Sequence, residues 1–307
     1  MKLVVVAGPT GIGKSRLALR LAVAAGGEIV NYDSIQIYRG FDIGSAKPSP
    51  DERRRVPHHL FDIAEAGDEF NAADYARLAR GVCAEIAARG KLPLLAGGTF
   101  FYLRALLGGL PEMPGSSESV RRRLRTVSAR PRGAAWLHRW LSRVDPVTAA
   151  RVAPADRHRV ERAIEVWVTS RSPISSWSRP PSGRSAGIDA LVLALTLDRS
   201  ALVGRLDARV EAMYGAGLVD ETRRLLDRHP GEARPFGAIG YREAAAVVRG
   251  ETGLQTAIAE TKRRTRAYAK RQMTWLRSER NVQWLPAADE EEAFRAAMRL
   301  VERFTID

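Results

Sequence analysis

The amino-acid sequence predicts an α/β protein, with a parallel sheet core that is flanked by helices and interrupted by a basic helical insertion. Short apolar runs alternate with segments of helical periodicity, and a glycine-rich turn follows the first run, which together predict the core. Between Arg121 and Arg184 there are 15 arginines, no lysines and 4 acids, a net +11 in 64 residues, which predicts the insertion. We expect a core of residues 1–112 and 190–307 and an insertion at 113–189.

The first elements of the core follow one another closely. Residues 3–7 form a β-branched apolar run that indicates a buried strand, and residues 15–25 place Leu, Ala and Arg at helical spacing. Residues 28–30 predict a second strand. Residues 70–89 carry apolar side chains at helical period, and Asn71 is suited to cap that helix.

The later elements complete the pattern. Residues 92–96 predict a third strand, residues 100–107 a helix, and residues 190–196 another buried strand, with helices in the rest of the C-terminal part. The order strand, helix, strand, helix, strand is typical of a parallel sheet. Proline and glycine interrupt it after Leu110, and the Ser-, Pro- and Gly-rich stretch 170–187 predicts a mobile loop.

Composition excludes several classes of protein. A chain of 307 residues with 45% hydrophobic and 27% charged residues is neither collagenous nor disordered, and it is long enough to bury a core without disulfides. The single cysteine, Cys83, predicts a reducing compartment and a place in the core. No apolar run approaches the ~20 residues of a membrane span. We therefore expect a soluble, cytoplasmic protein without a membrane partner, and nothing in the sequence requires more than a monomer.

The charge of the chain is concentrated in two regions. The net charge is +14, of which residues 121–184 carry +11 and residues 258–280 carry +6, so the remaining chain is near −3. An arginine-favouring genome explains a high total but not this clustering. Clustered positive charge favours binding to the phosphates of a nucleic acid, and the alternative is a solvated helix face.

The turn after the first strand has the pattern of a phosphate-binding loop. Residues 8–15, GPTGIGKS, fit GxxxxGK[ST] between a predicted strand and a predicted helix. Such a loop points its amide hydrogens at an anion, and the helix that follows adds a partial positive charge. Lys14 supplies a point charge, and the Ser15 hydroxyl is suited to bind Mg²⁺. The loop predicts a P-loop NTPase-like core and a diphosphate or triphosphate ligand, without specifying a nucleotide.

Two further polar residues are expected at the same edge of the sheet. Asp33 follows the second strand and Thr99 the third, and the carboxyl ends of adjacent parallel strands form one crevice. A carboxylate there can accept a proton from a nucleophile. A helix cap is the alternative for either residue. No acidic residue directly follows the strand 92–96, which counts against a motor ATPase and less against a small-molecule kinase.

Eight segments together resemble the tRNA dimethylallyltransferases, the isopentenylpyrophosphate transferase family that prenylates tRNA. They run through the chain in order and omit the loop near 170–190 and the C-terminal end. The segments are GPTGIGKS (8–15), DSIQIYRGFDIGSAKP (33–48), PHHLFDI (57–63), FNAADY (70–75), GGTFFYLRALLGGL (97–110), DPVTAARVAPADRHRVERAIEV (145–166), AIGYRE (238–243) and TRAYAKRQMTWLR (265–277).

The resemblance implies a reaction and a donor site. A dimethylallyl group would pass from dimethylallyl diphosphate to the exocyclic amine of the adenine 3′-adjacent to the tRNA anticodon, with release of diphosphate. Asp33 is implied as general base, Thr99 as a hydrogen-bonding partner of the acceptor, and Lys14 with Mg²⁺ as stabilisers of the leaving group. The implied diphosphate-binding residues are Gly8, Pro9, Thr10, Gly11, Ile12, Gly13, Lys14, Ser15 and Arg242, with Ser15 as the metal ligand.

The resemblance also implies a tRNA site, because the target base must leave the folded anticodon loop to reach Asp33. The implied contacts are Asp33, Ser34, Ile35, Gln36, Thr99, Arg121, His158, Arg159, Val160, Glu161 and Arg162. Three other functions stay open: a small-molecule P-loop kinase, a prenyl transferase for free adenine nucleotides, and a non-catalytic RNA-binding module. The tRNA hypothesis requires the loop 8–15 and Asp33 to open onto one cavity, with the insertion over its mouth.

Overall fold

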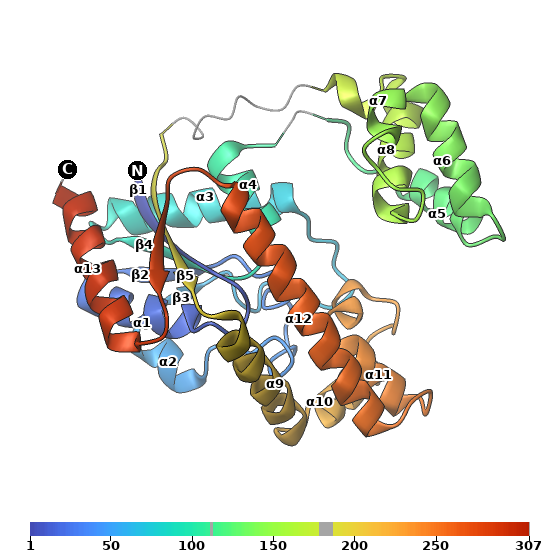
Figure 1. Ribbon diagram of the computed structural model, residues 1–307. Coiled ribbons are helices and arrows are strands. Elements are labelled where there is room, and N and C mark those ends of the chain that lie inside the picture. Colours follow the sequence, from blue (N-terminus) through green and yellow to red (C-terminus); the bar gives the residue numbers. More distant parts are fainter. Residues whose placement is uncertain (111–112, 178–186, 307) are drawn as a thin grey trace. The chain divides into compact units, whose positions relative to one another are not determined.

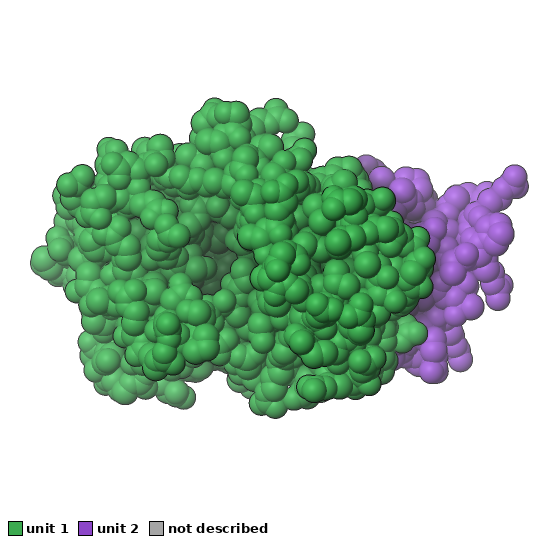
Figure 2. Space-filling view, turned by 90° about the horizontal axis from the view of Figure 1, so that it is seen from below, with its two compact units in different colours: residues 1–107, 184–307 green, residues 108–183 purple. Residues whose placement is uncertain are grey.

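The structure, a computed structural model, describes residues 1–110, 113–177 and 187–306 (Figure 1). The chain divides into two compact units, shown in different colours in Figure 2. Unit 1 comprises residues 1–107 and 184–307, and unit 2 comprises residues 108–183. Much of the loop that the sequence predicts at 170–187 falls on residues 178–186, which lie outside the described residues.

A parallel sheet of six strands forms the centre of unit 1. In spatial order the strands are β3 (His58–His59), β2 (Glu28–Asn31), β4 (Pro93–Ala96), β1 (Lys2–Ala7), β5 (Asp189–Thr196) and β6 (Val282–Pro286). The four predicted strands are confirmed as β1, β2, β4 and β5. The sequence missed β3, which has two residues, and β6, which lies at an edge and buries little besides Leu285.

Helices cover both faces of the sheet (Figure 1). Helix α1 (Lys14–Ala24) connects β1 to β2, and α3 (Ala72–Ala88) precedes β4 in the opposite direction, so right-handed crossovers place them on opposite faces. Helix α13 (Glu290–Ile306) joins α1 in one apolar core with the sheet side chains that face them, including Val4, Val6, Ile29, Leu94, Leu193 and Leu195.

Helix α3 begins and packs as the sequence predicts. The Asn71 side chain accepts hydrogen bonds from the amides of Ala73 and Asp74, at 2.8 and 3.2 Å, which satisfies donors that the first turn leaves open. Cys83, on the buried side of the helix, is 0% exposed, and burial raises the pKa of its thiol to about 12. The predicted cap and the predicted core position are both confirmed.

Unit 1 contains further helices among the described residues. They are α2 (Pro50–Arg55), α4 (Phe100–Gly108), α9 (Arg199–Gly215), α10 (Leu218–Leu226), α11 (Tyr241–Val248) and α12 (Leu254–Ser278), with a 3₁₀ turn at Arg234–Gly237. Helix α12 packs against both α9 and α11 (Figure 1). Among the described helices, none is long and apolar enough to cross a membrane.

Unit 2 is helical and has a core of its own. Its elements are α5 (Glu118–Ser128), α6 (Gly133–Val144), α7 (Pro146–Ala149), α8 (Arg157–Ser170) and a 3₁₀ turn at Ile174–Ser176. Apolar side chains from four helices pack together, namely Leu124, Leu137, Leu141, Ala149, Val160, Ala163 and Ile164. The buried carboxylate of Asp145 caps α7 and also accepts a hydrogen bond from the Ser175 amide at 2.9 Å, which ties the 3₁₀ turn to the helices.

Candidate active site

The glycine-rich loop 8–15 connects β1 to α1, in the context that its sequence predicts. Gly11 and Gly13 have φ of 74° and 108°, a left-handed backbone that favours glycine. The Lys14 ammonium donates a hydrogen bond to the Pro9 carbonyl at 2.9 Å. Ile12, one of the predicted anion contacts, is 2% exposed and packs in the sheet core, so only its backbone remains available to an anion.

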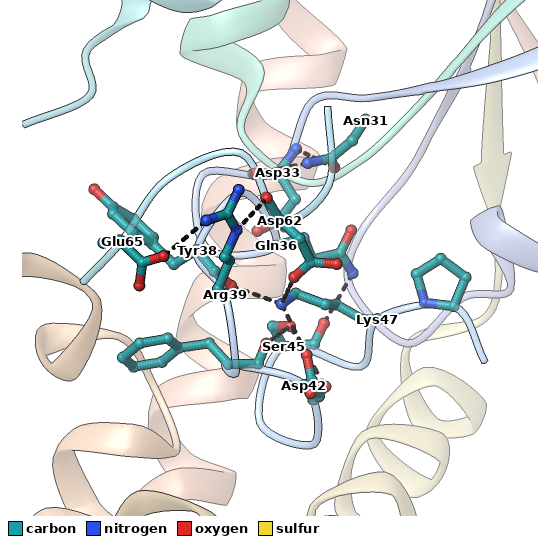
Figure 3. A network of polar contacts seen from close by, with 12 residues as sticks. Asn31, Asp33, Gln36, Tyr38, Arg39, Asp42, Ser45, Lys47, Asp62 and Glu65 are labelled. Carbon is teal, nitrogen blue, oxygen red and sulfur yellow. Dashed lines mark hydrogen bonds and ion pairs between the residues drawn. The ribbon is translucent and has the colours of Figure 1, made fainter. Parts of the chain in front are cut away.

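The turn after β2 holds the half-buried Asp33 in place. The Asp33 amide donates to Asn31 Oδ1 at 2.8 Å, and Asn31 Nδ2 donates to the Asp33 carbonyl at 3.1 Å (Figure 3). Asn31 Nδ2 also donates to the Leu60 carbonyl at 2.9 Å. The Ile35 amide donates to Asp33 Oδ1 at 2.9 Å. One carboxylate oxygen is therefore engaged by the backbone, which fixes the direction of the other.

The turn after β4 lies directly against Asp33. A β-carbon on Gly97 would lie 2.5 Å from the backbone carbon of Tyr32, and one on Gly98 would lie 3.0 Å from Asp33 Oδ2. Thr99 Oγ1 accepts a hydrogen bond from the Ser34 amide at 2.9 Å. The two glycines at the end of this strand, where a motor ATPase has an acid, are needed because any side chain would displace the Asp33 turn.

The loop 8–15 and Asp33 line the same cavity, at the carboxyl ends of β1, β2 and β4. The polar side chains and close-packed glycines around it are Thr10, Lys14, Ser15, Asp33, Gln36, Ser45, Glu52, His58, Gly97, Gly98, Arg209, Tyr268 and Gln272. The expected juxtaposition of the phosphate-binding loop with the carboxylate is confirmed. The expected place of the insertion over the cavity mouth stays a prediction.

Among the cavity residues that the sequence did not assign to the site are Arg209 of α9, and Tyr268 and Gln272 of α12. Tyr268 and Gln272 are four residues apart and so share a helix face, a spacing that could have drawn attention to them inside the TRAYAKRQMTWLR segment. Arg209 carries no local signal that separates it from the other arginines. Only the packing of α9 identifies it.

The cations of the cavity have few partners among the described residues. The half-buried guanidinium of Arg209 makes no hydrogen bond or ion pair with them, and burial lowers its pKa, although Asp33 opposes the effect. Burial also lowers the pKa of Lys14 to about 7, with the positive charge of Arg209 adding to the effect and Asp33 opposing it. Two cations with little compensation beside one carboxylate make the cavity attractive to an anion.

A buried lysine holds the segment 33–48 that forms one wall of the cavity (Figure 3). The Lys47 side chain is 3% exposed, and its ammonium donates to the Tyr38 carbonyl at 2.6 Å and to the carboxylates of Asp42 and Asp62, at 2.8 and 2.5 Å. Arg53 donates to the second oxygen of Asp62 at 2.8 Å. Burial raises the pKa of Asp62, but these hydrogen bonds outweigh it and hold the pKa below its usual value.

The predicted tRNA contact Gln36 lies on the same wall. Its amide nitrogen donates to the carbonyls of Ser45 and Ala46, at 3.0 and 3.1 Å, which closes the segment on itself (Figure 3). Ser34 and Ile35 are half-buried beside it. The side-chain amide of Gln36 is thus largely committed within the protein, and its oxygen remains for a ligand.

The predicted contacts in unit 2 are of three kinds. Arg121 and Arg162 engage the buried carboxylate of Glu165, with Arg121 Nε 3.1 Å and Arg162 Nη1 2.8 Å from its oxygens. Burial raises the pKa of Glu165, but hydrogen bonds from Arg162 and from a backbone amide hold it low. Val160 is 1% exposed and packs in the core, so its side chain is not available to tRNA. The other predicted contacts on α8 are His158 and Arg159, which are exposed, and Glu161, which is half-buried.

The structure does not bring Arg242 to the cavity, contrary to the prediction. Tyr241 is 0% exposed and fills the core beside α11, which turns the neighbouring Arg242 to the exposed side of the helix. The positive charge of Arg242 acts instead on Glu260 of α12, whose pKa is lowered mainly by a hydrogen bond from Arg263. Arg209, and not Arg242, is the arginine that lines the cavity together with the loop 8–15.

The parallel sheet, the glycine-rich loop after its first strand and the cavity at the strand ends define a P-loop NTPase-like α/β protein. A family model described as IPP transferase matches residues 36–279. The chain belongs to the IPP transferase family, which confirms the resemblance.

Relatives and solved structures agree with this assignment. The chain is 45% identical over 285 residues to the tRNA dimethylallyltransferase of Geobacter sulfurreducens, covering 92% of this chain and 91% of that protein. It is 49% identical over 286 residues to the one of Solibacter usitatus, covering 93% and 92%. The tRNA isopentenylpyrophosphate transferase of Bacillus halodurans superposes with a TM-score of 0.73 at 35% identity, covering 99% and 96%. A eukaryotic dimethylallyltransferase acting on tRNA gives 0.80 at 27% identity, covering 99% and 79%.

Proposed function

We propose that this chain is a tRNA dimethylallyltransferase, which moves the dimethylallyl group of dimethylallyl diphosphate to the exocyclic amine of the adenine 3′-adjacent to the anticodon. The observation that carries the proposal is that the phosphate-binding loop and Asp33 line one cavity. Relatives that are named tRNA dimethylallyltransferases, and a similar structure titled as acting on tRNA, support it. Diphosphate is the other product.

We assign the diphosphate of the donor to the loop 8–15, with Lys14 and Arg209 as its cations. Arginine presents paired donors that match phosphate oxygens, and Arg209 makes no hydrogen bond or ion pair within the described residues. Negative charge grows on the leaving diphosphate as the allylic carbon–oxygen bond breaks. Cations that already point into a partly enclosed cavity stabilise that charge without rearranging, which is the largest contribution expected from the protein.

Mg²⁺ fits the donor side of the cavity. Ser15 lines the cavity at the first turn of α1, and the carboxylate of Glu52 also reaches it. Mg²⁺ commonly uses one or two protein groups, with phosphate oxygens and water as its other ligands, so this sparse donor set is sufficient. When bound, the ion neutralises part of the charge on the leaving diphosphate.

We assign the acceptor amine to Asp33. The lone pair of an adenine amine is delocalised into the ring, so the amine is a weak nucleophile and gains from losing a proton. Asp33 Oδ1 is held by the Ile35 amide, which leaves Oδ2, on the side of Gly98, to receive that proton. The target base must be turned out of the anticodon loop into the cavity, where Thr99 and Ser34 lie beside Asp33.

We assign the anticodon stem to unit 2, whose arginines outnumber its acids. The exposed side chains of His158 and Arg159 lie at the start of α8, and neither is buried in the core of the unit. Phosphate contacts of this kind position a nucleic acid without reading its sequence. Arg121 and Arg162 contribute to this surface mainly through the part of their charge that the single carboxylate of Glu165 leaves uncompensated.

The test is an incorporation assay with radiolabelled dimethylallyl diphosphate and Mg²⁺, in three reactions that contain undermodified tRNA, AMP or ATP. Label in the tRNA, located by nuclease digestion at the adenine next to the anticodon, is the expected result. Label in AMP or ATP instead identifies a prenyl transferase for free nucleotides. If no acceptor takes label while radiolabelled ATP donates phosphate to a small molecule, the chain is a kinase and the proposal is wrong.

A further inference from the structure

One side chain connects the donor side of the cavity with its acceptor side. Gln272 of α12 is 3% exposed. Its Oε1 accepts a hydrogen bond from the Thr10 amide at 2.8 Å, and its Nε2 donates to the Gly98 carbonyl at 2.9 Å. A single amide group therefore joins the phosphate-binding loop to the turn after β4.

The same amide lies close to the carboxylate of Asp33. A β-carbon on Gly98 would lie 3.2 Å from Gln272 Nε2 and 3.0 Å from Asp33 Oδ2, so both atoms border the same small space. Tyr268, one turn earlier on α12, donates its hydroxyl to the Gly98 carbonyl at 2.7 Å. Helix α12 thus holds the Gly98 turn, and Asp33 Oδ2 lies beside the same turn.

This link removes one backbone amide of the loop 8–15 from the set that can bind an anion. The Thr10 N–H is committed to Gln272, which leaves the other loop amides together with Lys14 and Arg209 to bind a diphosphate. A partly buried N–H that loses its partner costs more than the bond itself contributes, and without the bridge the Gly98 carbonyl would keep only Tyr268. The bridge is therefore expected to persist while substrates bind and react.

We propose that Gln272 is a positioning residue that sets the separation between the diphosphate-binding loop and the Asp33 carboxylate. This inference rests on the proposed function. An amide is required because it accepts at one end, from Thr10, and donates at the other, to Gly98. A carboxylate can accept but not donate, and a thioether makes neither bond well. Displacement at an allylic carbon depends on alignment, and a misplacement of about 1 Å costs about 100-fold in rate.

The balance between rate and affinity provides a readout that a purely structural residue does not separate. Loss of the bridge leaves Lys14 and Arg209 in the cavity to bind a diphosphate, so diphosphate affinity should be kept while the alignment of the two substrates is lost. Gln272→Glu keeps an acceptor for the Thr10 amide but loses the donor to Gly98, and Gln272→Met loses both.

The experiment compares single-turnover prenyl transfer to tRNA in wild type, Gln272→Glu, Gln272→Met and Tyr268→Phe. Gln272→Met should react about tenfold or more slowly at saturating substrates, and Gln272→Glu should also be slow because it cannot donate to Gly98. Tyr268→Phe is the matched control: it removes the other donor to Gly98 but keeps the bridge, so it should lose less rate than Gln272→Met.

Binding of inorganic diphosphate and thermal unfolding are measured on each variant. The proposal requires a dissociation constant for diphosphate within about threefold of wild type in Gln272→Met, because the lost link sets alignment and not affinity. It is overturned if Gln272→Met reacts at the wild-type rate, if its rate loss is matched by an equal loss of diphosphate affinity, or if Tyr268→Phe loses as much rate as Gln272→Met. Should Gln272→Met fail to fold, the rate of Gln272→Glu decides. A wild type that binds diphosphate but prenylates no tRNA contradicts the proposed function instead.

Discussion

Diphosphate binding is expected to take up protons at Lys14. Burial lowers the pKa of this lysine from 10.5 to about 7 in the free protein, and the charge of Arg209 lowers it further while Asp33 opposes. Above pH 7 the side chain is therefore mostly neutral. A bound anion favours the charged form and raises the pKa again, so protons must move from solvent to protein during binding.

The expected number of protons follows from this pKa. At pH 8 a group with a pKa of about 7 is about nine-tenths neutral, so restoring its charge takes up about 0.9 proton per site. At pH 6 the side chain is already about nine-tenths charged, and the uptake falls to about 0.1 proton. The contribution of Lys14 to the affinity for diphosphate should accordingly weaken as the pH rises above 7.

The assay is calorimetric titration with inorganic diphosphate in pairs of buffers that differ in ionisation enthalpy, at pH 6 and pH 8. Lys14→Arg is the matched control, because an arginine keeps the positive charge at both pH values. The difference between wild type and Lys14→Arg cancels protons that the diphosphate itself gains or loses. The same proton number in both proteins at pH 8 would refute the reasoning, since it would mean that Lys14 is already charged in the free cavity.

Three further outcomes follow from the site. Arg209→Met should weaken diphosphate binding about tenfold or more, and Arg242→Met should change it less than threefold; calorimetry that finds equal effects contradicts the assignment of Arg209 to the diphosphate. Gly98→Ala should slow single-turnover transfer about tenfold, because its β-carbon would lie 3.0 Å from Asp33 Oδ2 and displace that carboxylate. An unchanged rate would contradict the claim that transfer depends on the position of Asp33. Raising salt from about 50 to 200 mM should weaken tRNA binding, followed by fluorescence anisotropy, far more than diphosphate binding; parallel losses argue against a phosphate-binding surface on the protein.

The strands were predictable where helices cover both faces of the sheet. The apolar runs of β1, β4 and β5 follow from that burial, because the residues on both faces of these strands are buried or half-buried. The strand β6 pairs with β5 alone and leaves Trp284 41% exposed, so its sequence has no continuous apolar run. Its place in the sheet comes from backbone pairing, which a hydrophobic pattern does not record.

The residues at the strand ends were predictable for a different reason. The loop 8–15, Asp33 and Thr99 each directly follow a strand, and parallel strands bring their carboxyl ends to one edge. Arg209 and Gln272 come from helices far along the chain, so their place depends on how α9 and α12 pack. Arg242 was misplaced because the sequence places it in a motif but does not show which side of α11 faces the core.

The central claim, that a phosphate-binding loop and the Asp33 carboxylate act in one cavity on one reaction, is tested most directly with Asp33→Asn. Single-turnover prenyl transfer is measured at saturating tRNA and dimethylallyl diphosphate, together with the affinities for tRNA and inorganic diphosphate. The account predicts a rate lower by about 100-fold or more with both affinities nearly unchanged, because only proton removal is lost. A rate close to wild type would contradict it.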